Sequence, residues 1–511
     1  MLRSSSGGNG SAYERTFIES LRPALKHLSQ YRIKVAVNAG ASDTHGLYQE
    51  VVKILDVSGI KLKVAWVDGD SVLSTVTSAQ EKGVEFRNIC TGERLQDWKF
   101  DPIYAHAYLG GLGIAKAFEE GADLVVCGRV SDASPVIGAA VWWHRWTRRH
   151  LDELANAFVA GHLIECSTYV CGGNFTGFKS LDAKGWHDIG FPIAEIASDG
   201  GVVITKQRNT GGLVSPNTCT SQLLYEIQGP WYFNSDVTAV LDEIRFDQMG
   251  PDRVAVKGVK ARPPPPTTKV GLTAPGGYQA ELRYFLVGLD IVEKSEMLKA
   301  QVIHILKPQR HNFSLLDFSL VGSAAENPSN QNAATVEFRI LAQAQKQEYL
   351  KPALFARPVV DCIMQAYPGA TWHLDLRTAF PKPIFEYFVT VLPQDHIHHV
   401  VHLDDGRTFK IDPPRADGKE STTYPTQQPS QERTAHPVAL TGDTIRGPLG
   451  WLVHARSGDK GSNANVGFWV TRDDEYAWLR TLLSVDTVKQ LLGDEYTGNK
   501  IVSFHISFGI F

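Results

Sequence analysis

The stretch that decides the fold is residues 121–136, GADLVVCGRVSDASPV. Residues 123–127 form a short apolar run, and the polar loop that follows contains Gly128, Arg129 and Asp132. An apolar run of this length between two helical patterns predicts a buried parallel strand that opens into a loop. Because open α/β sheets bind ligands at the carboxyl ends of their strands, we expect Arg129 and Asp132 near a ligand.

The residues before this stretch repeat the same pattern. Strands are expected at 33–37 and 62–67, and helices over 12–31, from the first loop to about Leu55, and over 105–120. Strand, polar loop and helix in repetition predict βαβ units, so the fold class is α/β with a parallel sheet. Right-handed crossovers would bring Asp68, Asp70 and Arg129 to one edge of that sheet.

The loop NAGASDTHG (38–46) is glycine-rich but contains no dinucleotide-binding fingerprint, and the chain has no Walker motif. No nucleotide cofactor is therefore expected. Ser42 and Asp43 have two interpretations: either of them caps the helix that follows, or they contact a ligand.

A second dense cluster lies at residues 161–175, GHLIECSTYVCGGNF. It places titratable, thiol and glycine positions within a dozen residues: His162, Glu165, Cys166, Cys171, Gly172, Gly173 and Asn174. We expect the active site here.

The C-terminal segment, 447–511, is predicted to be a separate small α+β unit of ferredoxin-like type. Strands are expected at 451–455, 468–471 and 500–506, with helices over 475–483 and 486–492. Between the first two strands, RSGDKGSNANVG (456–467) predicts a glycine-containing nest that receives an anion or carboxylate. The residues that suit this nest are His454, Arg456, Ser457, Asp459, Lys460, Asn463 and Asn465. The candidate binding residues among them are Ser457, Asp459, Lys460 and Asn463.

Residues 393–446 are predicted to separate this unit from the large domain over 31–392, which a tail and helix over 1–30 precede. A hairpin is expected over 395–412, with its turn at 404–406. Its four histidines suggest a metal site, but no partner spacing completes a tetrahedral set. Residues 413–442 are rich in Pro, Thr, Gln and Ser and predict a flexible linker.

Composition bounds the function classes. The 511 residues carry a formal net charge of −4, and 43% are hydrophobic, which predicts a soluble protein without an electrostatic footprint for nucleic acid. Six unevenly spaced cysteines predict a reducing compartment, and no apolar run reaches the length of a membrane span. We expect a cytoplasmic protein that binds neither nucleic acid nor membrane, and a homo-oligomer by analogy with enzymes of this size.

Several long motifs together resemble the acyclic terpene utilisation AtuA family. They are CGRVSDAS (127–134), GHLIECSTYVCGGNF (161–175), FPIAEI (191–196), DGGVVITK (199–206), QLLYEIQGP (222–230) and HARSGDKGSNANVGF (454–468). The resemblance runs from Arg32 onward, and the segment from Gly447 resembles the family's ferredoxin-fold C-terminal domain, which is a separate chain in many bacterial relatives. It implies a role in degrading branched acyclic terpenoids as CoA thioesters.

This resemblance implies a small branched carboxylate or acyl-CoA substrate, and a cofactor-independent lyase or hydratase. Addition or elimination of water, or carbon–carbon cleavage next to a carbonyl, needs a base, an acid and a group that stabilises an enolate. We expect Glu165 and Asp132 to be base and acid, with His162 as the alternative acid. The groups expected to hold a carboxylate or the enolate oxygen are Arg129, Lys206, Lys460 and the backbone N–H groups of Gly172 and Gly173.

Three alternatives remain open. Cys166 or Cys171 with His162 would make a thiol hydrolase, although buried inert cysteines are more common. His162, Glu165 and Cys171 would bind a divalent metal, although their spacing fits no familiar zinc template. His162 and Glu165 would otherwise be an ordinary pair on one helix face, in a non-enzymatic binding scaffold.

Overall fold

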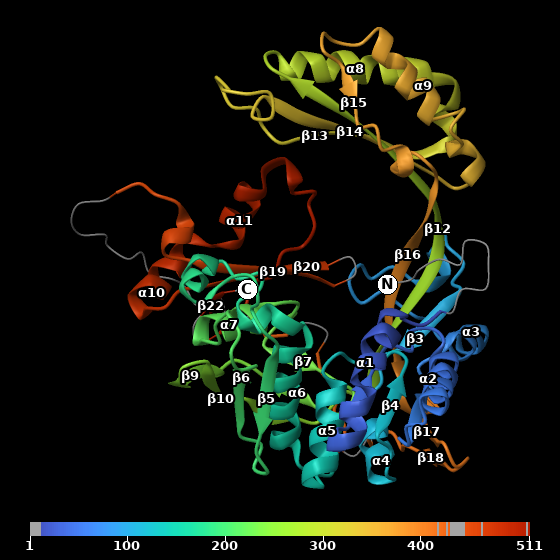
Figure 1. Cartoon of the computed structure of the whole chain (residues 1–511), viewed down its shortest axis with the longest axis vertical. Helices are drawn as coiled ribbons and strands as arrows, with labels where there is room; N and C mark the ends of the chain where they lie inside the picture. The colour runs from blue at the N-terminus through green and yellow to red at the C-terminus, as the bar shows by residue number, and fades with distance from the viewer. Residues whose placement is uncertain are drawn as a thin grey trace. The chain divides into compact units, whose positions relative to one another are not determined.

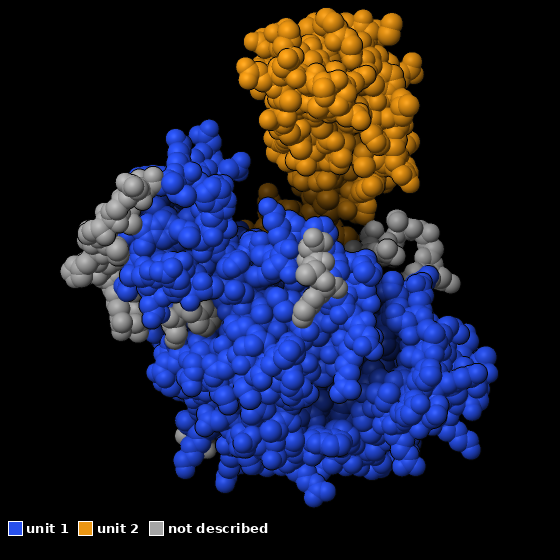
Figure 2. All heavy atoms as spheres, turned by 60° about the vertical axis from the view of Figure 1, so that its left-hand side comes forward, with its two compact units in different colours: residues 1–96, 104–271, 389–511 blue, residues 97–103, 272–388 orange. Residues whose placement is uncertain are grey.

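The computed structural model describes residues 12–415, 418–425, 428–429, 445–460, 463–506 and 509–510; the side chains of 182–184, 460 and 509–510 are outside this description. The chain forms two compact units, which Figure 2 shows in different colours. One unit contains residues 97–103 and 272–388, and the other contains the rest. The predicted single domain over 31–392 is therefore divided between them.

A parallel sheet organises the N-terminal part, as predicted. Its strand order is β1-β4-β2-β17-β18, in which β4 (Leu124–Cys127) pairs in parallel with both β1 (Val35–Val37) and β2 (Val64–Asp68). Every residue of β4 is buried, as its apolar run requires. Helix α1 (Thr16–Tyr31) precedes β1, α2 (Thr44–Ser58) follows β1, α3 (Leu73–Glu81) follows β2, and α4 (Leu112–Glu119) precedes β4.

The predicted helix over 105–120 is wrong in its first third. Residues Tyr104–Ala107 form a strand, β3, which pairs with β12 (Thr267–Val287). The helix α4 begins only after the glycine segment 110–111. These glycines allow close packing: a Cβ on Gly111 would lie 2.4 Å from the carbonyl oxygen of Ser134.

The predicted histidine-rich hairpin is present, but it belongs to the sheet. Strand β17 (Val400–Leu403) pairs with β18 (Thr408–Lys410) and, on its other side, antiparallel with β2. His402 stacks on Trp66 of β2 with 4.0 Å between ring centroids. The hairpin therefore extends the α/β sheet and is not part of a linker.

Helices α5 (Ser134–His144) and α6 (Leu151–Glu165) connect this sheet to two antiparallel sheets (Figure 1). The first sheet contains β5 (Pro192–Ile196), β6 (Val202–Lys206), β10 (Arg253–Lys257) and β9 (Arg245–Gly250). The second contains β11 (Lys260–Arg262), β8 (Thr238–Val240) and β7 (Trp231–Phe233). Helix α6 is buried against both sheets, and α7 (Pro216–Leu224) packs against it.

The other unit is a sheet covered by helices. Its strands are the distal part of β12, with β13 (Phe313–Val321), β14 (Thr335–Ala344), β15 (Thr371–Trp372) and β16 (Lys382–Pro393). Helices α8 (Ile291–Leu306) and α9 (Ala356–Asp361) lie together on one face of this sheet (Figure 1).

The C-terminal segment has the predicted order of elements, two strands, two helices and a terminal strand region, but this order is not ferredoxin-like. Its described elements are β19 (His454–Lys460), β20 (Asn463–Trp469), α10 (Asp473–Leu482), α11 (Val485–Leu492), β21 (His505–Ile506) and β22 (Gly509–Ile510). A ferredoxin-like unit alternates strands and helices as βαββαβ, whereas here two strands, two helices and two strands follow one another. Trp469, Phe504 and Ile506 belong to the same apolar core as α6 and α7, which holds the segment in place.

Part of the predicted linker is bound to the protein surface. The backbone N–H of Thr422 donates to the Pro264 carbonyl oxygen over 2.9 Å, and the Tyr424 hydroxyl donates to that of Pro263 over 2.6 Å. The side chain of Ser421 is buried. Residues 430–444 lie outside the described residues. Among the helices of the described ranges, none combines the length and the apolar character that a bilayer span requires.

Candidate active site

His162 is the centre of a buried polar group at the end of α6. Its side chain is fully buried, and its Nε2 lies 3.1 Å from the carbonyl oxygen of Leu223. Because a carbonyl oxygen only accepts hydrogen bonds, this contact assigns a proton to Nε2. The other ring nitrogen, Nδ1, lies 3.2 Å from the Tyr232 hydroxyl and 3.4 Å from Glu165 Oε1. One imidazole nitrogen is thus shared by a phenol and a carboxylate.

Glu165 keeps one oxygen unused. Its side chain is only 9% exposed, and Oε2 is buried with no hydrogen-bond partner among the described residues. Leaving a buried carboxylate oxygen unpaired is costly, so this atom makes Glu165 a candidate site residue. The chain turns sharply just beyond it, because Ser167 adopts a left-handed conformation with φ of 57°.

Three carboxylates act electrostatically on the phenol of Tyr232, which lies in β7. Burial, and then the negative charges of Glu165, Asp132 and Glu226, raise the pKa of its phenol well above the ordinary value. The ring stacks on Phe158 of α6 with centroids 4.4 Å apart. Tyr232 therefore stays protonated at neutral pH and can donate its proton.

The loop after β4 lies at the carboxyl-end edge of the parallel sheet, as predicted. Arg129 forms an ion pair with Asp132, and its guanidinium carbon lies 4.7 Å from the centroid of the Tyr108 ring. The backbone N–H of Arg129 donates to Asp70 Oδ2 over 2.7 Å. Burial raises the pKa of Asp70 to about 6, against the opposing effect of that N–H. Since Asp132 also acts on Tyr232, this edge and the end of α6 adjoin.

The C-terminal hairpin reaches the same region. Arg456 is 7% exposed, and its guanidinium carbon lies 4.7 Å from the ring centroid of Tyr169 and 4.3 Å from that of Tyr225. Asn465 accepts from the backbone N–H of Glu226 over 3.1 Å and donates to the Leu224 carbonyl oxygen over 2.6 Å.

The backbone nest predicted over 456–467 is wrong in its conformation, because most of this segment forms the paired strands β19 and β20. Ser457 pairs with Val466, and Asp459 with Ala464. The regular ladder uses the backbone groups that a nest would turn toward an anion. Ser457, Asp459 and Asn463 are exposed, and the Lys460 side chain lies outside the described residues.

Other predicted site residues have structural partners. The ammonium of Lys206 donates to Thr210 Oγ1 over 2.6 Å and so fastens the turn after β6. The N–H groups of Gly172 and Gly173 donate to the carbonyl oxygens of Tyr169 and Thr168, so neither is free for an oxyanion. Asn174 is exposed. Burial raises the pKa of the Cys171 thiol to about 12, although Lys206 opposes this shift.

The first polar loop has a capping role. Asp43 is the N-cap of α2, and its Oδ1 accepts from the backbone N–H of Gly46 over 2.9 Å. The capping interpretation is thus confirmed for Asp43. Ser42 donates its backbone N–H to the Ala12 carbonyl oxygen, 3.2 Å away.

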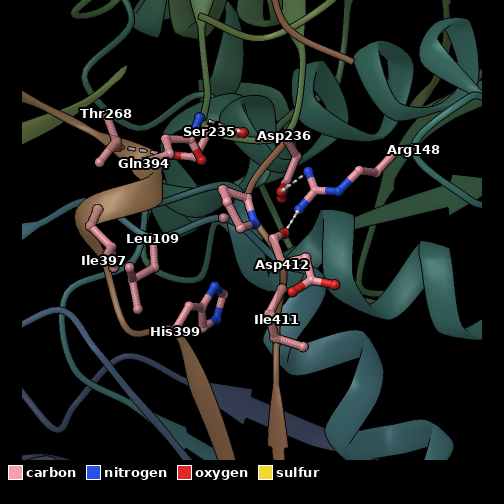
Figure 3. Close-up of a pocket in the computed structure, with 12 residues that line it drawn as sticks. Leu109, Arg148, Ser235, Asp236, Thr268, Gln394, Ile397, His399, Ile411 and Asp412 are labelled. Carbon is pink, nitrogen blue, oxygen red and sulfur yellow. Dashed lines mark hydrogen bonds and ion pairs between the residues drawn. The ribbon is translucent and has the colours of Figure 1, made fainter. Parts of the chain in front are cut away.

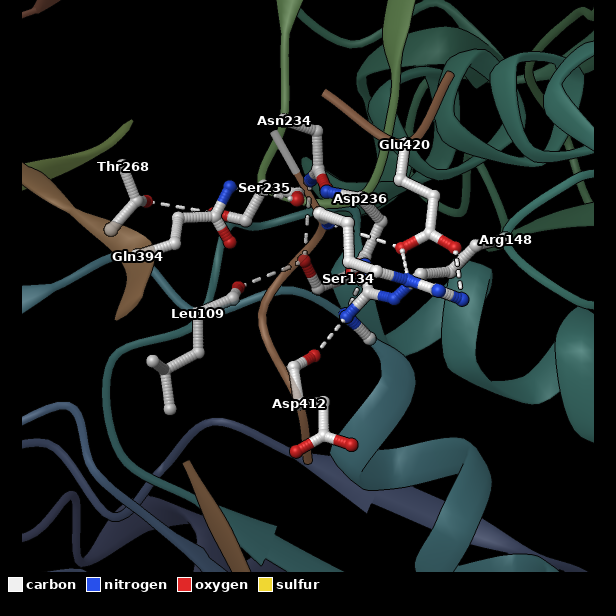
Figure 4. Close-up of polar contacts among 12 residues, drawn as sticks. Leu109, Ser134, Arg148, Asn234, Ser235, Asp236, Thr268, Gln394, Asp412 and Glu420 are labelled. Atoms are coloured by element: carbon white, nitrogen blue, oxygen red, sulfur yellow. Dashed lines mark hydrogen bonds and ion pairs between the residues drawn. The ribbon is translucent and has the colours of Figure 1, made fainter. Parts of the chain in front are cut away.

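A small cavity lies elsewhere, at Arg148 and Asp236 (Figure 3). Its volume of about 20 Å³ suits roughly one water molecule and not a substrate. Figure 4 shows a hydrogen-bonded network around it, in which the Ser235 and Thr268 hydroxyls lie 2.7 Å apart and Asn234 donates to Ser134. This network joins distant segments and has a structural role.

A family model described as acyclic terpene utilisation family protein AtuA matches residues 2–403. The chain belongs to this family. The match ends in strand β17, so it contains His162, Glu165 and Tyr232 but not Arg456. Searches of curated proteins and of solved structures found no match.

The two tyrosines that lie in or beside the buried polar group of His162 were not selected from the sequence. Tyr225 and Tyr232 lie in or beside the motif QLLYEIQGP, which also contains Glu226, whereas Arg456 lies in HARSGDKG, the motif that was expected to receive an anion. These motifs indicated the segments involved, but the φ of 61° at Glu226 is a backbone conformation that the sequence does not display. In the described ranges, no group of three or more His, Cys, Asp or Glu residues is arranged to hold a metal ion.

Proposed function

We propose that this AtuA-family chain is a lyase of the hydratase type, which acts on a small branched carboxylic acid or acyl-CoA. One observation carries the proposal: buried His162 lies between the Tyr232 phenol and Glu165, whose second oxygen is unpaired. A base, a relay and an acid within hydrogen-bond reach of one another are the parts that proton transfer next to a carbonyl needs. The family's link to terpene utilisation supports an enzymatic role.

In the proposed elimination, Glu165 Oε2 removes the proton on the carbon next to the carbonyl. The electron pair left on that carbon forms the double bond as the hydroxyl on the neighbouring carbon departs. Tyr232 gives its proton to the leaving hydroxyl, which becomes water, and the proton on Glu165 returns to Tyr232 through His162 Nδ1. Hydration is the same sequence in reverse.

The alternative thiol hydrolase has less support. A thiol attacks as its thiolate, and the pKa of Cys171 is raised to about 12 by burial, so this thiol stays protonated at neutral pH. Cys166, which is only partly buried, is the remaining candidate nucleophile.

The test is mass spectrometry of the full chain incubated in ¹⁸O-water with branched hydroxyacyl-CoA, enoyl-CoA and free hydroxy acid compounds. We expect gain or loss of water by one of them, with activity lost in Glu165→Gln and retained in Glu195→Gln. Glu195 is the matched control because it is an exposed glutamate paired with Arg253. Release of free CoA with one ¹⁸O in the acid, abolished by Cys166→Ser, would replace the proposal with a hydrolase.

A further inference from the structure

Arg456 is a buried cation with no counter-charge among the residues that the structure describes. Its Nη2 is buried, and in the described part of the chain it has neither a hydrogen-bond partner nor a carboxylate within ion-pair distance. Arginine does not lose its proton at any ordinary pH. A buried charge that is left unpaired costs several kcal/mol, roughly as much as a folded domain can spare. The folded protein therefore needs favourable interactions of the guanidinium that offset the cost of burying this charge.

Two tyrosine rings supply part of these interactions. Tyr169 and Tyr225 lie within cation–π distance of the guanidinium, and each such contact is favourable, more so away from water. The rings fix the guanidinium but do not accept hydrogen bonds from Nη2. A fixed fork of N–H donors with an unused edge is suited to a planar carboxylate.

The surrounding backbone is arranged to keep Arg456 in this position. Gly458, two residues further along β19, lies so close to the main chain that a Cβ there would be 2.7 Å from the nitrogen of Glu226. Asn465 on the neighbouring strand holds both Leu224 and Glu226. The β19–β20 hairpin thus packs against the segment that contains Tyr225, and this packing places the Arg456 guanidinium beside the Tyr225 ring.

The same segment adjoins the acid–base group. Glu226 and Cys166 act electrostatically on both Tyr225, beside Arg456, and Tyr232, beside His162. An anion on Arg456 would therefore place the rest of a small molecule toward Glu165.

We infer that Arg456 is the anion-recognition residue of this site and that the substrate carries a free carboxylate, which binds the guanidinium edge. This inference rests on the proposed function for the reaction, but not for the binding. The C-terminal hairpin then completes the site within one chain, by adding the group that the matched family region lacks.

The test is calorimetric titration of the full chain with glutarate and succinate, compared with inorganic phosphate and pyrophosphate at matched ionic strength. We expect the carboxylates to bind the unaltered protein. Arg456→Met should weaken that binding about tenfold or more, because a charged hydrogen-bond pair is lost. Arg472→Met is the matched control, since Arg472 is an exposed arginine of the same segment paired with Asp474.

Two further variants keep the test decisive if Arg456→Met does not fold. Arg456→Lys retains the charge but not the fork and should bind with intermediate affinity, and Tyr169→Leu should weaken binding by removing one ring face. Glu165→Gln should bind the carboxylates as the unaltered protein does. That result, with loss of turnover, separates the two proposals.

Carboxylate binding that is unchanged by Arg456→Met would overturn the inference while leaving the proposed reaction intact. Binding of phosphate or pyrophosphate alone would overturn the carboxylate assignment, because it would give Arg456 to a phosphate of a carrier. Full turnover in Glu165→Gln, with Arg456-dependent binding retained, would overturn only the proposed function.

Discussion

At the scale of single residues, the position of His162 determines how protons can move. Its Nε2 is committed to the Leu223 carbonyl oxygen, so only Nδ1 can exchange a proton, with Tyr232 on one side and Glu165 on the other. A freely rotating imidazole could not give such direction to the transfer. The roles of the three side chains follow from this single backbone contact.

Removing the Tyr232 hydroxyl should therefore separate catalysis from stability. In Tyr232→Phe the ring can keep its stacking on Phe158, and the lost hydrogen bond costs about 1 kcal/mol of unfolding free energy. Turnover should fall by about 10²-fold or more, because the general acid is gone. Turnover assays and urea unfolding measure the two effects.

Tyr367→Phe is the control for this change. Tyr367 is equally a buried phenol and donates to the Phe285 carbonyl oxygen over 2.8 Å, but it belongs to the other unit. It should lose similar stability and no turnover. Equal turnover in both variants would remove Tyr232 from the mechanism.

The thiols should differ in reactivity according to burial. Cys127, Cys171 and Cys219 are buried, and burial raises the pKa of each thiol. Iodoacetamide at about pH 8 should therefore modify them only after denaturation, whereas partly buried Cys90 and Cys166 should react in the native protein. Peptide mass spectrometry identifies the modified cysteines. Rapid labelling of Cys171 in the native protein would contradict this expectation and make Cys171 a candidate nucleophile again.

At the scale of elements, the edge of the parallel sheet contains a titrating group. Burial raises the pKa of Asp70 from 3.8 to about 6. Between these pH values the folded protein holds a proton on Asp70 that the unfolded chain has released. The contribution of Asp70 to the free energy of unfolding is therefore greatest below pH 3.8 and is lost as the pH rises through 6. The lost contribution is about 3 kcal/mol.

Asp70→Asn should remove this pH dependence. Its amide oxygen can still accept from the backbone N–H of Arg129. Between about pH 4 and about pH 7, its unfolding free energy should fall less than that of the unaltered protein, by about 3 kcal/mol. Urea unfolding at several pH values measures the difference, with the exposed Asp486→Asn as control. Parallel curves for Asp70→Asn and the unaltered protein would show that Asp70 titrates normally.

The elements themselves could largely be predicted where the hydrophobic pattern was local. The run Leu124–Cys127 and its two parallel neighbours were predicted correctly, because each is a short apolar strand followed by a helix. The strands β19 and β20 were predicted too short, since their ladder runs through a glycine-containing segment that also has the composition of a loop. Whether this segment is a strand or a loop depends on pairing with the neighbouring strand, which the sequence does not show.

At the scale of the whole molecule, the site depends on segments far apart in the chain. The sequence predicted that Glu165 and the C-terminal motif would contribute, but it favoured Lys206, Gly172 and Gly173, whose polar groups are used locally. Arg456 was placed in the segment expected to receive an anion, but Tyr232 could not be selected, because its surroundings come from burial beside charges brought by other segments.

A change in how the C-terminal hairpin packs should therefore alter hydrogen exchange and turnover at residues outside the hairpin. In Gly458→Ala the added Cβ would meet the backbone nitrogen of Glu226, so the hairpin must shift. Hydrogen exchange at residues 224–226 should speed up, and turnover should fall. Gly450→Ala, where a Cβ meets no atom within 4 Å, is the control. Unchanged exchange and turnover in Gly458→Ala would mean that the hairpin does not support the site.

The measurement that tests the central claim most directly is solvent deuterium exchange, because it detects proton removal by Glu165 even without net turnover. The full chain is incubated in D₂O with the branched acids and acyl-CoA compounds, and mass spectrometry counts deuterium on the carbon next to the carbonyl. We predict exchange with the unaltered protein and with Glu195→Gln, and its loss in Glu165→Gln. Exchange at an unchanged rate in Glu165→Gln would contradict the assignment of Glu165 as the base.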